Sequence, residues 1–124
     1  MKKKYVDWWE VEAYVQGVYQ YVEDNKLKLS GVYGLPRGGL VLAVMLSHRL
    51  NIPLLMSPTN DCLIVDDISD SGESLIHYCN NSSGIDTYYY TITTMFWNED
   101  STVAPDYYWD VKREYWIVFP WEVN

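Results

Sequence analysis

The beginning of the chain carries apolar side chains at the spacing of one helix face. Asp7 and Glu10 are three residues apart, in the arrangement of a capping box that opens a helix. The valines that follow recur every three or four residues, at Val11, Val15, Val18 and Val22. This periodicity predicts an amphipathic helix over about residues 7–25, with the valines facing the core.

Beyond this helix, short apolar runs alternate with turns and helical segments. Strands are predicted where β-branched and aromatic residues cluster between turn residues, at 31–35, 53–56, 62–65, 86–96 and 115–119. Helices are predicted for the apolar segment 40–50, which follows the turn PRGG, and for 73–79, which precedes the turn residues NNSSG. This alternation indicates a single-domain α/β fold over residues 1–124, with a mostly parallel twisted sheet flanked by helices.

Composition and charge exclude several classes of protein. The chain has 9 Lys and Arg against 17 Asp and Glu, a net charge of −8, and no Lys or Arg occurs over 51–111. An acidic surface disfavours nucleic-acid binding, because phosphate backbones are bound mainly by basic residues. The sequence has neither a signal-peptide pattern nor a membrane-spanning run, so we expect no membrane association and a cytoplasmic location. Cys62 and Cys79 lack metal-ligand spacing and are expected to be reduced core thiols.

Polar residues concentrate directly after the predicted strand 62–65, in the stretch LIVDDISDSGES. Asp66 and Asp67 at the strand end can accept hydrogen bonds from two sugar hydroxyls and can hold Mg²⁺, which prefers hard oxygen ligands. The turn after them contains Gly72, and the hydroxyls of Ser71 and Ser74 add donors that suit a phosphate. Asp70 in this turn is better placed as a base. In isolation, the acidic pair would instead be read as a helix cap at Asp66 and a solvated Asp67.

The same stretch resembles the phosphoribosyl pyrophosphate signature of the type I phosphoribosyltransferases. The resemblance implies that Asp66 and Asp67 bind the ribose and Mg²⁺, and that the 5-phosphate lies on the following turn, at Asp70, Ser71, Gly72, Glu73 and Ser74. GLPRGG is similar to the pyrophosphate loop of the family, often of unusual peptide geometry, which implies that Arg37, Gly38 and Gly39 meet the leaving group. An ordinary helix start with a surface arginine is the alternative for that loop.

Residues 115–122, YWIVFPWE, are similar to the small C-terminal hood of the purine branch of this family. The resemblance implies that Trp116 stacks on the base, that the backbone of Ile117 meets the base edge, and that Glu122 closes the motif. Trp121 is expected to pack in the core. A lysine of the family, located before PDYY, corresponds here to Asn98, whose amide can both donate and accept. The implied reaction joins a 6-oxopurine to phosphoribose from phosphoribosyl pyrophosphate, with Asp70 as the general base.

The sequence departs from the family in one further respect. The long mobile loop that covers the reaction centre is replaced by residues 57–61, which are too few to fold over a nucleotide. We therefore expect a slow enzyme, or one whose site a neighbouring subunit closes. Two readings stay open for the aromatic residues Tyr88, Tyr89, Tyr90 and Trp97: a contact in a homodimer, or core positions of a strand. Two alternatives stay open: a module that binds phosphoribosyl pyrophosphate or a nucleotide without chemistry, and an unrelated sugar-phosphate-binding domain of the same architecture.

Overall fold

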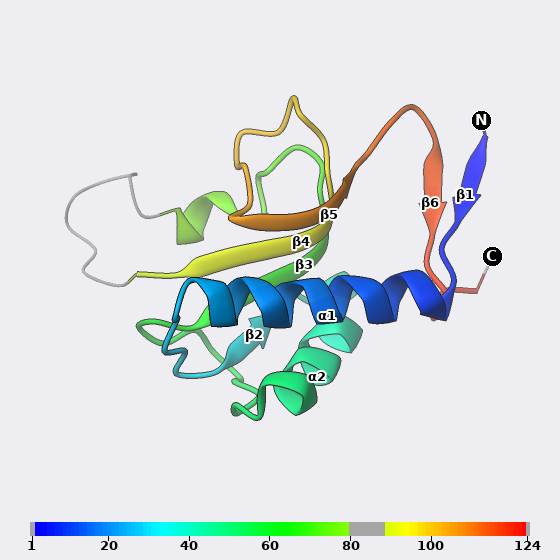
Figure 1. The fold of residues 1–124 in the computed structure, drawn as a ribbon. Coiled ribbons are helices and arrows are strands. Elements are labelled where there is room, and N and C mark those ends of the chain that lie inside the picture. Colours follow the sequence, from blue (N-terminus) through cyan, green and yellow to red (C-terminus); the bar gives the residue numbers. More distant parts are fainter. Residues whose placement is uncertain (1, 80–88, 124) are drawn as a thin grey trace.

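A computed structural model describes residues 2–79 and 89–123 of the 124-residue chain. These described residues form, in chain order (Figure 1), β1 (Lys3–Tyr5), α1 (Trp8–Asp24), β2 (Val32–Gly34), α2 (Gly38–Leu50), β3 (Leu63–Ser69), the 3₁₀ turn η1 (Ile76–Tyr78), β4 (Thr91–Trp97), β5 (Tyr107–Val111) and β6 (Trp116–Val118). These elements confirm the predicted α/β class.

The central sheet has four parallel strands in the order β2-β3-β4-β5. Helices α1 and α2 cover one face, where Tyr14, Leu42 and Leu46 are fully buried in the larger core cluster (Figure 1). The other face is covered by the segments that follow β3 and β4, through Leu75 and Val103. The carboxyl ends of the strands therefore meet at one edge, where ligands bind in sheets of this kind.

Helix α1 forms as its sequence predicts. Asp7 is the N-cap, and its Oδ1 accepts a hydrogen bond from the backbone N–H of Glu10 at 2.9 Å. The Glu10 side chain pairs with Lys4, at 3.6 Å between Oε1 and Nζ. All four predicted valines of this helix are buried, so the apolar stripe packs against the sheet as expected.

A second sheet holds the two ends of the described chain together. Strands β1 and β6 pair in parallel, with Lys3 opposite Trp116, and lie beside each other away from the central sheet (Figure 1). The backbone N–H of Val6 extends the pairing to the carbonyl of Val118 at 2.9 Å. This small sheet corresponds to the C-terminal hood, and β1 is a component of it that the sequence pattern did not predict.

Several predicted boundaries differ from the structure. The expected strand at 53–56 is reduced to a single bridge between Val32 and Leu54. The expected helix at 73–79 is a turn followed by the three residues of η1, because Leu75 is drawn into the core beneath the sheet. The strand expected at 86–96 begins at Thr91, and residues 86–88 lie outside the described residues. Strand β5 was not predicted.

The two cysteines differ in burial. Cys62 is a buried thiol, as expected, whereas Cys79 is only partly buried, so it is not a core residue; neither forms a disulfide among the described residues. Burial raises the pKa of the Cys62 thiol, which favours its unreactive protonated form.

Among the described residues, no helix combines the length and apolar character that crossing a bilayer requires.

Candidate active site

The glycine-rich start of α2 packs directly against the end of β3. Gly39 leaves no room for a side chain, because a Cβ there would meet the carbonyl oxygen of Val65. A Cβ on Gly38 would overlap the carboxylate of Asp67. The peptide bond between Pro36 and Arg37 is cis. The turn PRGG and the acidic pair, separated by almost thirty positions in the sequence, therefore form one continuous wall of the site.

Asp66 and Asp67 are both partly buried in the carboxyl-terminal part of β3, which continues past the predicted strand end at Val65 to Ser69. The Asp66 Oδ1 accepts from the backbone N–H of Asp67 at 2.9 Å, and the Asp67 Oδ1 accepts from that of Ile68 at 2.8 Å. Burial, followed by the charge of Asp67, raises the pKa of Asp66. Burial also raises the pKa of Asp67, and Glu122 adds to that rise. The pair therefore favours a ligand that brings positive charge or hydroxyl donors.

The turn after β3 bounds a small cavity. Gly72 adopts a left-handed conformation with φ of 85°, which a side chain would strain, and its carbonyl accepts from the N–H of Leu75 at 3.1 Å. The cavity, of about 90 Å³, is lined by Asp66, Ile68, Ser69, Asp70, Ser71, Gly72, Ser74 and Leu75. Four of the five residues predicted to bind the phosphate line it, and Glu73 is exposed beside them. Without the predicted helix, any anion here would depend on the amides and hydroxyls of the turn itself.

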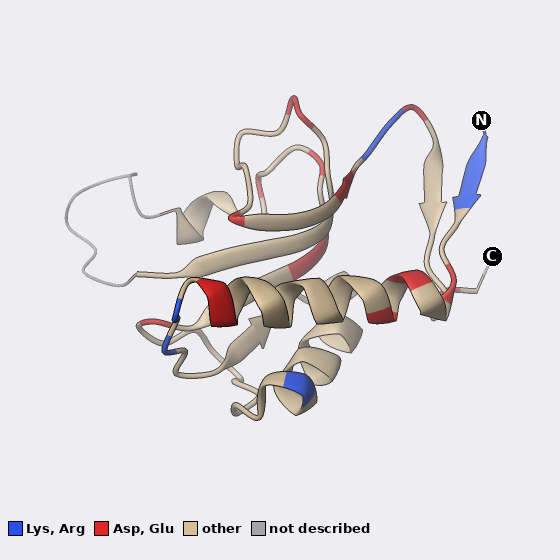
Figure 2. Cartoon of the chain, in the orientation of Figure 1, with Lys and Arg blue, Asp and Glu red and all other residues tan. Residues whose placement is uncertain are grey.

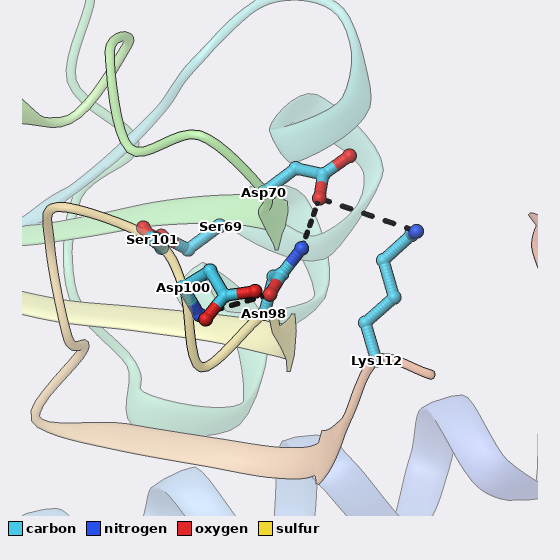
Figure 3. A network of polar contacts seen from close by, with 6 residues as sticks. All are labelled: Ser69, Asp70, Asn98, Asp100, Ser101 and Lys112. Atoms are coloured by element: carbon cyan, nitrogen blue, oxygen red, sulfur yellow. Dashed lines mark hydrogen bonds and ion pairs between the residues drawn. The ribbon is translucent and has the colours of Figure 1, made fainter. Parts of the chain in front are cut away.

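Ser69 has a structural position within this turn. Its hydroxyl donates to the carbonyl of Val103 at 2.9 Å and lies 2.8 Å from the Ser101 hydroxyl (Figure 3). Since Ser69 is buried, this pair of contacts fixes the loop after β4 against the loop after β3. The two loops therefore approach the site as one unit.

Asp70, Asn98 and Lys112 meet at the ends of three neighbouring strands (Figure 3). The Asn98 amide donates to Asp70 Oδ1 at 2.9 Å, and Lys112 Nζ lies 4.0 Å from the same oxygen. The Asn98 Oδ1 accepts from the N–H of Asp100 at 2.9 Å, which fixes the orientation of the amide. The spacing to PDYY predicts Asn98 and gives no indication of Lys112. Lys112 could have been recognised from its position directly after β5, the last strand of the parallel sheet.

The residues predicted to contact the base are divided between two regions. Asn98 lies beside Asp70, Ile117 is buried with 4% of its surface exposed, and Trp116 is 60% exposed on β6. Glu122 instead accepts from the N–H of Phe119 at 2.8 Å and lines a cavity of about 730 Å³ together with Arg37, Gly38 and Asp67. The structure thus places Glu122 on the side of PRGG. Trp121 stacks on Phe119 with ring centroids 4.8 Å apart and is partly buried against the core, as expected.

The short connection at 57–61 lies far from these residues in the fold. Its backbone joins the amino-terminal edge of the sheet, where the N–H of Ser30 donates to Asp61 at 3.0 Å and the N–H of Asp61 donates to Tyr89 at 2.8 Å. Asp70 is left 60% exposed. Residues 57–61 are thus held at the edge opposite the acidic pair.

Comparisons with known proteins agree with this geometry. No family model matches the sequence, and no curated protein matches it. Among solved structures, a purine phosphoribosyltransferase from Pyrococcus horikoshii superposes with a TM-score of 0.82 at 30% identity, over 100% of this chain and 97% of that chain. A xanthine-guanine-hypoxanthine phosphoribosyltransferase from Helicobacter pylori superposes with a TM-score of 0.78 at 20% identity, over 98% and 94%.

A hypoxanthine-guanine phosphoribosyltransferase from Bacillus anthracis shares the fold with a TM-score of 0.65 at 14% identity, over 88% of this chain and 81% of that chain. The fold, the acidic pair and the two loops define an α/β enzyme of the phosphoribosyltransferase class. The chain belongs to the type I phosphoribosyltransferase family, in its purine branch, as the resemblance implied.

Proposed function

We propose that the enzyme transfers the 5-phosphoribosyl group from phosphoribosyl pyrophosphate to a ring nitrogen of a 6-oxopurine, in nucleotide salvage. The observation that carries the proposal is the placement of Asp66 and Asp67 between the glycine-rich start of α2 and the turn 69–74. A sugar with phosphate groups at both ends fits that order. Its diol would lie at the two acids, its 5-phosphate on the turn and its pyrophosphate at Arg37. In the reaction, the bond from C1 of ribose to the pyrophosphate oxygen breaks and a bond from C1 to the base nitrogen forms.

The acidic pair fits Mg²⁺. Two partly buried carboxylates with raised pKa values gain from a cation, and Mg²⁺ is usually held by one or two carboxylates together with substrate phosphates and water. Within residues 2–79 and 89–123, no cluster of three or more acidic, histidine or cysteine side chains forms a closed metal site, so substrate oxygens would complete the coordination. When bound, the ion would offset the negative charge on the departing pyrophosphate.

The side chains and backbone of the chain itself supply the other groups that the reaction needs. Asp66 and Asp67 accept hydrogen bonds from the ribose hydroxyls, and the amides and hydroxyls of residues 70–74 hold the 5-phosphate. Arg37 and the N–H groups of Gly38 and Gly39 orient the pyrophosphate. Asp70 accepts the proton that the purine nitrogen loses, because it is exposed next to the phosphate turn and beside the Asn98 amide. Trp116 stacks on the base from the side of the hood, and the backbone of Ile117 meets the base edge.

The open geometry supports a slow reaction. Residues 57–61 cannot shield the centre from water, and Asp70 is largely exposed, so transition-state charge is less well stabilised than in a closed site. A second copy of the chain that covers this edge would restore the closure. A higher turnover at protein concentrations that favour dimers would support that arrangement.

The test is an assay of pyrophosphate and nucleotide formation with Mg²⁺, phosphoribosyl pyrophosphate and one base at a time. We expect turnover with hypoxanthine, guanine or xanthine, and its loss in Asp70→Asn with binding of phosphoribosyl pyrophosphate retained. Glu99→Gln removes an exposed carboxylate from the same loop region and serves as the matched control. Absence of turnover with every base, despite tight ligand binding in calorimetry, would contradict the proposal and favour a binding module.

A further inference from the structure

Strand β4 carries two adjacent threonines whose hydroxyls differ in their partners. Thr93 faces helix α1, where its Oγ1 lies 2.8 Å from the Tyr14 hydroxyl, and it donates to the carbonyl of Tyr107 at 2.8 Å. Thr94 is fully buried, and its Oγ1 has no hydrogen-bond partner within the part of the chain that the structure describes. A buried hydroxyl without a partner is costly, so the presence of one at this position needs an explanation.

Thr94 lies beside Asp66 in the sheet. The two residues are opposite each other in the parallel register of β3 and β4. Side chains of residues paired in this way lie on the same face, and neighbouring strands are about 4.8 Å apart. Since Thr93 points to α1, Thr94 points to the opposite face, where Asp66 and Leu75 line the small cavity of the turn after β3. The hydroxyl without a partner and the first acid of the pair are therefore neighbours.

The carboxylate of Asp66 has acceptor positions left for a donor from β4. Its Oδ1 accepts from the backbone N–H of Asp67 at 2.9 Å. An ionised carboxylate offers about four acceptor positions in all. Strands β3, β4 and β5 carry no Lys or Arg, and Figure 2 shows no blue on them. A side-chain donor that reaches Asp66 from the neighbouring strand must therefore be uncharged, and the Thr94 hydroxyl is such a donor.

We propose that Thr94 is a positioning residue for the sugar site, which donates to the Asp66 carboxylate when phosphoribosyl pyrophosphate is bound. This inference rests on the proposed function. When the ribose hydroxyls bind, the carboxylate rotates to meet them, and the Thr94 hydroxyl gains the acceptor that it lacks in the free protein. The new bond fixes the rotation of the carboxylate, so that its remaining acceptor positions face the sugar. The cost of the buried hydroxyl is removed on binding, and this difference adds to the affinity.

The variant Thr94→Val replaces the hydroxyl with a methyl group of similar size. Without ligand, we expect it to unfold at the same temperature as the parent or higher, because it no longer buries a polar group without a partner. Phosphoribosyl pyrophosphate with Mg²⁺ should bind about 10- to 100-fold more weakly, the range for one hydrogen bond to a charged group. Inorganic phosphate has no sugar hydroxyls, and its affinity should stay within about twofold of the parent value.

Two further variants separate positioning from packing. Thr94→Ser keeps the hydroxyl and removes a methyl group, so we expect lower stability with an affinity for phosphoribosyl pyrophosphate within about threefold of the parent. Thr93→Val removes a hydroxyl that already has partners, and we expect lower stability with an affinity within about twofold. A merely structural Thr94 would instead change stability and affinity in parallel in all three variants.

Calorimetry measures the affinities, and thermal unfolding measures the stabilities. A Thr94→Val variant that binds phosphoribosyl pyrophosphate as tightly as the parent would overturn the role of Thr94. A Thr94→Val variant that is less stable than the parent without ligand would also overturn it, because the hydroxyl would then have a partner already. Both results leave the proposed function standing. Failure of the parent chain to bind phosphoribosyl pyrophosphate would overturn the proposed function together with this inference.

Discussion

Gly38 and Asp67 adjoin so closely that a methyl group at position 38 would overlap both carboxylate oxygens of Asp67. The absence of a side chain at Gly38 therefore sets the position of an acid on a different element. The start of α2 and the end of β3 are one structural unit, and the site depends on the fit between them.

Substitution of the two glycines should separate binding from stability. Gly38→Ala would push the Asp67 carboxylate aside, and we expect phosphoribosyl pyrophosphate to bind at least about tenfold more weakly. Gly39→Ala meets the backbone carbonyl of Val65, which cannot rotate away, so we expect a loss of about 1–3 kcal/mol in the free energy of unfolding. Calorimetry and urea denaturation measure the two effects. If a folded Gly38→Ala variant bound phosphoribosyl pyrophosphate with wild-type affinity, the wall formed by PRGG and the acidic pair would not be needed for binding.

Removal of the charge at Asp66 should stabilise the protein and abolish its activity. Because the pKa of Asp66 is raised above its ordinary value of 3.8, the folded state binds more protons than the unfolded state above that pH. The free energy of unfolding therefore falls as pH rises from 3.8 through the raised pKa, and the penalty is fully present above it.

We expect Asp66→Asn to increase the free energy of unfolding at pH 8, by about 1.4 kcal/mol for each unit of pKa shift that it removes. The difference should shrink toward pH 4, and Mg²⁺-dependent turnover should be lost. Denaturation at a series of pH values, with Glu99→Gln as an exposed-acid control, measures this. An Asp66→Asn variant that is less stable than the parent at pH 8 would contradict the assignment.

Ser69, the last residue of β3, and Ser71, in the turn after it, should differ in what their substitution affects: stability for Ser69 and phosphate binding for Ser71. Ser69→Ala removes a buried hydroxyl that donates to Val103, so we expect a loss of about 1–2 kcal/mol in stability. Ser71→Ala removes an exposed hydroxyl, and we expect a binding loss of about tenfold for ribose 5-phosphate with little change in stability. Thermal unfolding and calorimetry check the pair. The opposite pattern would place the phosphate elsewhere.

The fold class and the site loops could be predicted because they rest on local patterns. The first three residues of β3, Leu63–Val65, are buried and read as a continuous apolar run, and the valines of α1 repeat with the helical period. Strand β5 escaped prediction because an exposed position carries Tyr108 between the partly buried Tyr107 and Trp109, so the alternation of burial is not visible in the sequence. Strand β1 consists of two lysines and a tyrosine, and only its pairing with β6 makes it a strand.

Contacts between distant segments account for the other differences. Leu75 packs into the core cluster on the second face of the sheet, and this contact leaves only η1 of the predicted helix. Lys112 and Asp70 meet because parallel strands end at one edge, a relationship that spacing along the sequence does not express. Glu122 faces Asp67 rather than the Asn98 region because the turn after β6 redirects it.

The pairing of β1 with β6 has a consequence for biosynthesis. A ribosome makes Lys3 long before Trp116, so the first strand must wait for its partner while the rest of the domain is being made. Contacts of such long sequence separation form late and slowly. The hood, and with it the side proposed to meet the base at Trp116, should therefore be the last part of the nascent enzyme to assemble.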